Sequence, residues 1–239
     1  MKTSSKVSFD LFSLQMSWSL WFFGITTVVY FVLGAVAFSD SDSLELSFFA
    51  FMLQPAKIYL LVLGILSISS FLPFYLQQGV TRRDYFIGTT LSAIGLSITL
   101  AAMSGIVTLI LYLIHRWLSL PDFISFTSDI YPDASLMIDF AVFIVTSLAY
   151  YVAGWFIGIG FYKYSALLGM SFIALSLLFG ALIDLLLKSE SGIFQYLVDF
   201  NPDAFSFTLP ISLLIIIFVI GMILTVIRRL TRTIPVKIK

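Results

Sequence analysis

The chain has no cysteine and a single histidine, His115, among its 239 residues. Without cysteine, disulfide bonds, thiolate metal sites and cysteine nucleophiles are excluded. Charged residues make up 11% of the chain, whereas a soluble globular domain carries about 25%. The sequence also lacks the G-x-x-x-x-G-K-[ST], H-E-x-x-H and G-x-S-x-G motifs. We therefore expect no enzymatic activity, no metal site and no cofactor on this chain.

Long apolar runs recur along the whole length, and 60% of the residues are hydrophobic. Each run reaches the roughly 20 residues that a helix needs to cross about 30 Å of hydrocarbon. Because the backbone in lipid must satisfy its own hydrogen bonds, and strand-like alternation is missing, the runs are predicted to be helices. The fold class is an all-α polytopic membrane protein with one transmembrane domain over residues 1–239. Six transmembrane helices are expected at Trp18–Phe38, Ile58–Leu76, Phe86–Ile114, Ile138–Phe161, Ser165–Leu187 and Leu209–Ile227.

The net charge is zero, but basic and acidic residues are segregated along the chain. Ten of the thirteen Lys and Arg residues fall in the two tails and in the second-to-third and fourth-to-fifth connections. Most of the acids fall in the other connections. Because basic residues near span ends mark the cytoplasmic side, both termini are predicted to lie inside (N-in, C-in).

The segment before the first span, residues 5–17, mixes apolar and polar side chains. On a helix, Val7, Leu11, Leu14 and Trp18 would share one face. One interpretation is a short amphipathic interfacial helix lying on the inner leaflet. The other is a tail that merges into the first span.

Ionisable residues inside a membrane are costly and often functional. Asp139 and Asp184 lie within about one turn of the predicted outer surface. Each is interpreted either as a solvated or helix-capping aspartate, or as a ligand contact at the outer mouth of a pathway. No acid or histidine is predicted at the centre of a span, which disfavours a proton-coupled transporter.

Small residues follow one face of several spans and let helices approach closely. Gly154 and Gly158 do so in the fourth span, and Gly88, Ser92 and Gly95 in the third. Packing within the chain is one explanation. A dimer seam or the lining of a polar cavity is the other.

The most concentrated polar break inside the chain is the turn after the second span, residues 77–85. Pro73 precedes it and is predicted to kink that span, because proline lacks an N–H donor. Gly79 can take the left-handed conformation that ends a helix. Thr81 and Asp84 have the spacing of a capping box, which predicts a helix start at Thr81.

In these residues the chain resembles the permease subunits of ABC transporters of the type-2 exporter class. Such permeases commonly carry a cytoplasmic turn of the form G-[VTS]-[ST]-R-[RK]-x-[FY]-[FW] between their second and third spans. The matching positions are Gly79, Val80, Thr81, Arg82, Arg83, Tyr85 and Phe86. The six-span layout, the segment before the first span and the very short fourth-to-fifth turn also agree with this family.

The resemblance implies that the turn seats in a cleft of a cytoplasmic ATPase and transmits its closure to the spans. The residues given this ATPase-coupling role are Gln78, Gly79, Val80, Thr81, Arg82, Arg83, Asp84, Tyr85 and Phe86. Arg82 and Arg83 would meet acidic or carbonyl partners, and Tyr85 and Phe86 an apolar notch. From charge alone, both arginines could instead follow the positive-inside rule and meet lipid phosphates.

The predicted function is therefore that of the permease subunit of an ATP-driven exporter in a bacterial plasma membrane. Its expected partners are a cytoplasmic ABC ATPase that binds ATP and Mg²⁺, a second identical or related permease subunit and the lipid bilayer, but no nucleic acid. The apolar spans favour an amphipathic or hydrophobic substrate, such as a peptide, a lipid-linked molecule or a drug. The alternatives are an ion- or proton-coupled secondary transporter and a non-transport immunity or assembly protein.

Overall fold

The computed structural model describes residues 3–39, 47–118, 136–187 and 208–233. Within these residues, six helical segments are long and apolar enough to cross a membrane, and no strand is present. The chain is thus an all-α polytopic membrane protein, as predicted. The helices are α1 (Thr3–Ser39), α2 (Phe48–Leu66), α4 (Arg82–Leu118), α5 (Leu136–Lys163), α6 (Ala166–Leu186) and α7 (Leu209–Arg232). A π-helical turn, η1 (Ser67–Phe71), and the short α3 (Leu72–Gln77) continue α2 in one span.

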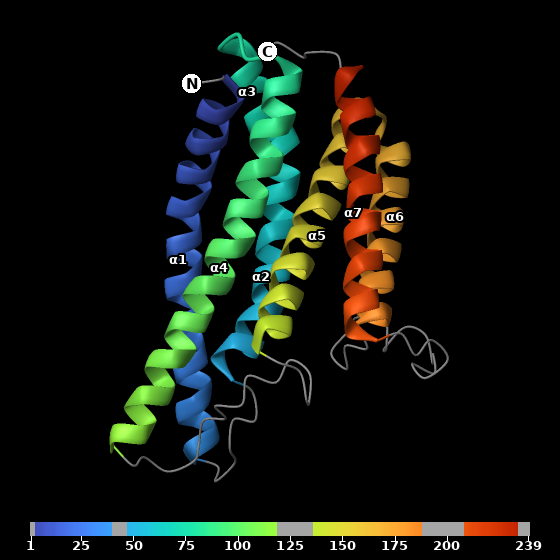
Figure 1. The fold of residues 1–239 in the computed structure, drawn as a ribbon. Helices are drawn as coiled ribbons and strands as arrows, with labels where there is room; N and C mark the ends of the chain where they lie inside the picture. The colour runs from blue at the N-terminus through green and yellow to red at the C-terminus, as the bar shows by residue number, and fades with distance from the viewer. Residues whose placement is uncertain (1–2, 40–46, 119–135, 188–207, 234–239) are drawn as a thin grey trace.

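Successive spans run in opposite directions, so the helix ends and the connections between them lie at the two ends of the bundle (Figure 1). The start of α1, the turn between α3 and α4, the connection from α5 to α6 and the end of α7 all lie at one end. This placement agrees with the predicted position of both termini on one side. The acidic connections that the charge count assigns to the other side lie outside the described residues.

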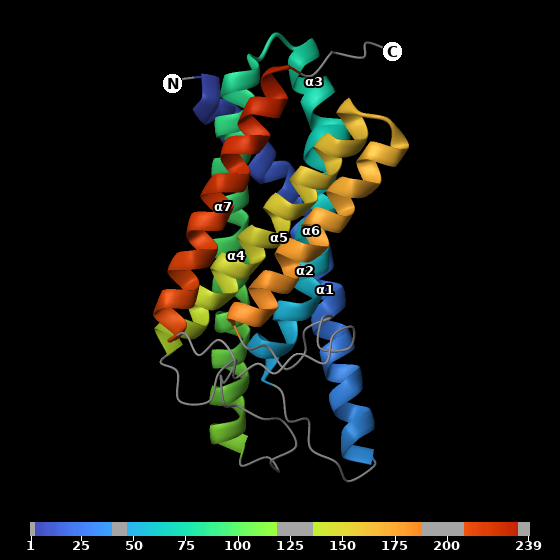
Figure 2. The ribbon, with the colours of Figure 1, turned by 90° about the vertical axis from the view of Figure 1, so that its right-hand side faces the viewer.

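Helix α5 is at the centre of the bundle, with α1 on one side and α6 and α7 on the other (Figures 1 and 2). It packs against α2, α4, α6 and α7, whereas α1 packs mainly against α4. In the most apolar 18-residue stretch of α5, half is buried inside the chain, against 22% of the same stretch in α6 and in α7. The outer helices therefore present most of their apolar surface outward, as lipid-facing spans do.

The contact between α2 and α5 depends on glycine. A Cβ added at Gly154 would overlap the carbonyl oxygen of Leu61 and lie 2.7 Å from its carbonyl carbon. On the other helix, a Cβ added at Gly64 would overlap the carbonyl oxygen of Tyr151. The backbones are therefore in direct contact, which only glycine allows. For Gly154 and Gly158, which faces Ile65 of α2, the structure confirms the explanation of packing within the chain.

The segment before the first span is helical, but it is not a separate interfacial helix. Helix α1 runs without interruption from Thr3 to Ser39, about 55 Å at 1.5 Å per residue. Val7 and Leu11 are buried, and Val7 packs on Gly88 of α4. The glycine leaves room for this contact, so the segment joins the bundle and extends the first span. The interpretation as a merging tail is the correct one.

The second span begins ten residues earlier than predicted, at Phe48 instead of Ile58. The hydroxyl of Ser47 caps its start by accepting a hydrogen bond from the amide of Ala50 at 3.2 Å. Pro55 and Lys57 lie inside this helix, where the sequence predicted the end of a polar connection. A buried counter-charge allows Lys57 to lie within the span.

Candidate functional site

The predicted turn between α3 and α4 is closed by a C-capping motif on one side. Gly79 has a φ of 82°, in the left-handed region that favours glycine. Its amide donates to the carbonyl of Leu76, and the amide of Val80 donates to the carbonyl of Tyr75, both at 3.1 Å. These two bonds form a Schellman motif, which ends α3 in a fixed geometry. The prediction for Gly79 is confirmed.

The other side of the turn is closed by the predicted helix cap at Thr81, with Asp84 as its partner. The amide of Asp84 donates to the hydroxyl of Thr81 at 3.1 Å, and this hydroxyl donates to the Asp84 carboxylate at 2.7 Å. Helix α4 begins at the next residue, Arg82. The carboxylate also lies in the first turn, where it complements the helix dipole.

The two arginines of the turn differ in their surroundings. Arg82 is half-buried and donates from Nη1 to the backbone carbonyl of Arg232, at the end of α7, at 2.6 Å. Arg83 is exposed, as are Gln78, Gly79 and Thr81. Arg82 therefore ties the turn to the last span, and Arg83 is the arginine that presents its charge outward.

Tyr85 does not lie where the resemblance placed it. Its side chain is fully buried, and its hydroxyl donates a hydrogen bond to the backbone carbonyl of Ser67. Phe86 is half-buried, with its ring 5.4 Å from that of Trp155 and 5.9 Å from the guanidinium carbon of Arg228. Because α4 starts at the turn, its first inward-facing positions fall on these two residues. The resemblance implied that Tyr85 contacts an apolar notch of a partner. In the structure this side chain instead packs inside the bundle of its own chain.

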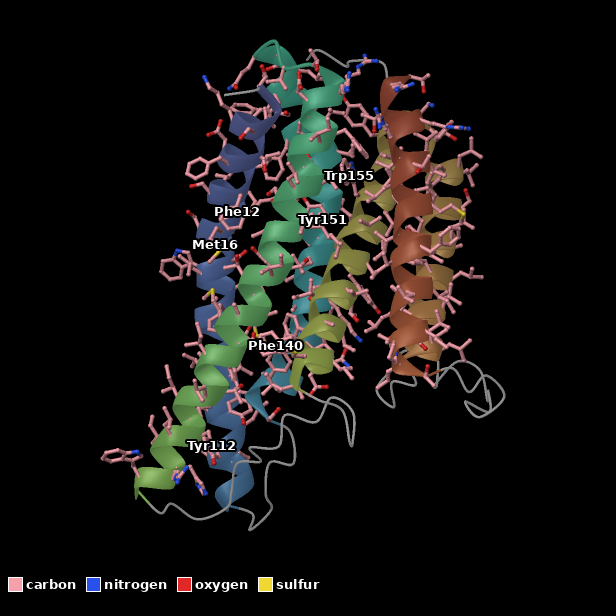
Figure 3. All side chains as sticks on the ribbon, in the orientation of Figure 1. Phe12, Met16, Tyr112, Phe140, Tyr151 and Trp155 are labelled. Carbon is pink, nitrogen blue, oxygen red and sulfur yellow. The ribbon has the colours of Figure 1, made fainter. Side chains whose placement is uncertain are left out.

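Behind Tyr85 lies a buried polar network that the sequence did not reveal. The amide nitrogen of Gln15 donates to the hydroxyl of Tyr151 at 3.1 Å, and this hydroxyl is 2.6 Å from the hydroxyl of Ser67. Ser92 of α4 donates to the amide oxygen of Gln15 at 3.0 Å. The network joins α1, α4, α5 and the π turn, in the half of the bundle that carries the turn (Figure 3). Two sequence signals lay near it: Pro73, and Ser92 in the small-residue face of the third span.

A second buried polar contact joins α2 to α6. The ammonium of Lys57 is 3.5 Å from the carboxylate of Asp184, and both side chains are less than a tenth exposed. The same ammonium is 5.6 Å from the centre of the Tyr150 ring of α5. Asp184 is therefore neither solvated nor a cap, and Lys57 does not belong to a polar connection. Asp139 lies in the first turn of α5 as predicted, but its side chain is buried.

Comparison of the chain with known protein families, with curated proteins and with solved structures finds no match. The likeness to ABC permeases thus depends on the residues of the turn and on the layout of the spans.

Proposed function

We propose that this chain is the membrane-spanning permease subunit of an ATP-driven ABC exporter, powered by a separate cytoplasmic ATPase. The observation that carries the proposal is the geometry of the turn from Gln78 to Arg83. Its residues Gln78, Gly79, Thr81 and Arg83 are exposed, the turn lies at the same end as both termini, and both of its sides are capped.

A polar connection that only set the topology would need no fixed shape. This turn has one, because the Schellman motif holds it to α3 and the helix cap at Thr81 holds it to α4. Arg82 adds a third attachment, to α7. A push on the exposed Arg83 would therefore move the ends of the second, third and last spans together, which is what a coupling element must do.

The proposal includes a second permease subunit and an amphipathic or hydrophobic cargo. Helices α6 and α7 each bury only 22% of their most apolar 18-residue stretch against their own chain. The remaining surface is available to lipid, to a second subunit or to an apolar part of the cargo. Charged groups in the described spans are few, which suits such a cargo better than a small hydrophilic solute.

The test is purification of the tagged chain from its native membranes in mild detergent, with mass spectrometry of the proteins that copurify. We expect the parent chain to recover an ATPase that carries a Walker motif, and Arg83→Glu to lose it. Arg229→Glu is the matched control, because Arg229 is an exposed arginine at the same end but outside the turn. Equal recovery of the ATPase with Arg83→Glu would contradict the coupling role.

Arg82 is less suited to this test than the sequence suggested. Its side chain holds the end of α7, so Arg82→Glu changes the bundle as well as the surface charge. The double change of Arg82 and Arg83 to glutamate should abolish recovery of the ATPase. It does not separate the two effects, whereas Arg83→Glu alone does.

The buried pair of Lys57 and Asp184 favours a second candidate, an ion- or proton-coupled transporter. Intramembrane ionisable residues often mark ion and proton pathways, and the sequence had placed Asp184 at a span end and Lys57 outside the spans. Reconstituted liposomes that contain the chain alone and a trapped pH indicator decide between the candidates. Proton flux that Asp184→Asn abolishes would support this candidate. Flux no faster than in empty liposomes would leave the ATP-driven exporter as the better one.

A further inference from the structure

The second span changes its helical pattern close to its cytoplasmic end. In the π turn η1, the amide of Leu72 donates to the carbonyl of Ser67, five residues back. Pro73 follows immediately and has no N–H to donate to the carbonyl four residues before it. A π turn followed by proline is a common site of bending in a helix. The segments α2 and α3 therefore meet at a point where the span can change its direction.

Ser67, the first residue of the π turn, has hydrogen-bond partners in α2, α3, α4 and α5. Its hydroxyl donates to the carbonyl of Leu63 at 3.0 Å, so the hydroxyl of Tyr151 must donate in the contact between them. Tyr151 in turn accepts from Gln15. The backbone carbonyl of Ser67 accepts from Tyr85 as well as from Leu72.

Tyr85 connects this point to the turn. It lies in the first turn of α4, and its amide donates to the carbonyl of Thr81 at 2.9 Å. Its ring is 5.8 Å from the ring of Tyr75 in α3, on the other side of the turn. The turn, α3 and the first residues of α4 thus form one unit, and the bond from Tyr85 to Ser67 joins this unit to the first residue of the π turn.

We propose that Tyr85 is a positioning residue that sets the bend of the second span at the π turn, through its hydrogen bond to Ser67. When the bond is intact, α3 has one fixed direction relative to α2. When the turn is displaced, the hydroxyl leaves the carbonyl, which keeps its bond from Leu72, and α3 changes its direction relative to α2. The proposed function supplies the force that displaces the turn, but the bend itself is a property of this chain alone.

The test uses the absence of native cysteine, which allows two spin labels without background. Ile58→Cys in α2 and Phe74→Cys in α3 place exposed labels on the two sides of the π turn. The distance between the labels is measured by pulsed electron paramagnetic resonance on the full chain in nanodiscs. Leu91→Cys with Ile106→Cys, both exposed on the uninterrupted helix α4, is the control pair.

Tyr85→Phe removes only the hydroxyl. We expect the population of labels at a second distance to rise about fivefold relative to the population at the parent distance. This is the effect of losing one buried hydrogen bond. Tyr75→Phe, a change of the neighbouring ring, and the control pair on α4 should show no such shift. A distribution with Tyr85→Phe that equals that of the parent would overturn the proposal.

Where Tyr85→Phe gives no folded chain, 4-fluorophenylalanine at position 85 serves in its place, because it fills the space of the hydroxyl but donates no hydrogen bond to Ser67. The expected second distance and the overturning result are the same. In the complex with the ATPase, Tyr85→Phe should still copurify, because Arg83 is unchanged. Addition of ATP should change the distance in the parent but not in Tyr85→Phe. Failure to recover any ATPase would contradict the proposed function, whereas the measurement on the chain alone still decides the role of Tyr85.

Discussion

The closest packing in the bundle predicts a large loss of stability from one added methyl group. In Gly154→Ala, the new Cβ would lie 2.7 Å from the carbonyl carbon of Leu61 and would overlap the oxygen of that carbonyl. Carbon atoms in favourable contact are about 3.5–4.0 Å apart. Helices α2 and α5 must therefore separate by about 1 Å, since the atoms in contact belong to the backbone and cannot rotate away.

The size of the loss follows from that separation. A gap of about 0.5–1 Å already forfeits a quarter to a half of the dispersion energy of each atom pair across an interface. Insertion of an extra methyl group into a packed core costs about 1–3 kcal/mol in general. For Gly154→Ala we expect a loss at the upper end of this range, about 3 kcal/mol, because no side chain can yield.

The assay is unfolding of the chain in mixed micelles by a titration with dodecyl sulfate, followed by tryptophan fluorescence, to which the buried Trp155 contributes. Gly221→Ala is the matched control, because a Cβ there meets nothing within 4 Å. It should be neutral or stabilise the chain by up to about 1 kcal/mol, the difference in helix propensity between the two residues. A free energy of unfolding for Gly154→Ala that equals that of Gly221→Ala would refute direct contact between α2 and α5.

The same unfolding measurement tests three further features. Lys57→Met should cost about 3–5 kcal/mol because it leaves Asp184 buried without its partner, whereas Lys57→Met with Asp184→Leu should return close to the parent; equal losses in both variants would contradict a buried pair. Gly79→Ala should cost about 1–2 kcal/mol because it forces a side chain into the left-handed region. Thr81→Ala should cost about 1 kcal/mol through loss of the cap and should speed amide exchange in the first turn of α4; unchanged exchange there would contradict the cap.

The features that the sequence predicted well depend on local pattern. Six apolar runs give six spans because lipid leaves the backbone no alternative to a helix. Gly79 and Thr81 end and start helices through bonds to residues within five positions, so spacing alone predicted both. The charge split likewise predicted that both termini lie at one end of the bundle.

The features that the sequence missed depend on partners far along the chain. Lys57 looked like part of a polar connection, because its counter-charge Asp184 lies more than a hundred residues away. Gln15 looked like a polar residue of an interfacial segment, but it bonds to Tyr151 and Ser92 inside the bundle. In this chain the lipid-facing side chains and most of the buried side chains are both apolar, so hydrophobic periodicity does not separate the inward face from the outward one.

Whether the turn meets an ATPase is tested most directly by photocrosslinking in native membranes. Gln78→Cys gives the chain a single attachment point for a benzophenone label in the exposed turn, and Trp117→Cys gives one near the far end of α4, where the side chain is 85% exposed. If the chain is an ABC permease, position 78 crosslinks to a protein that mass spectrometry identifies as an ATPase with a Walker motif, and position 117 does not. Crosslinks from position 78 to lipid alone would contradict the coupling role of the turn.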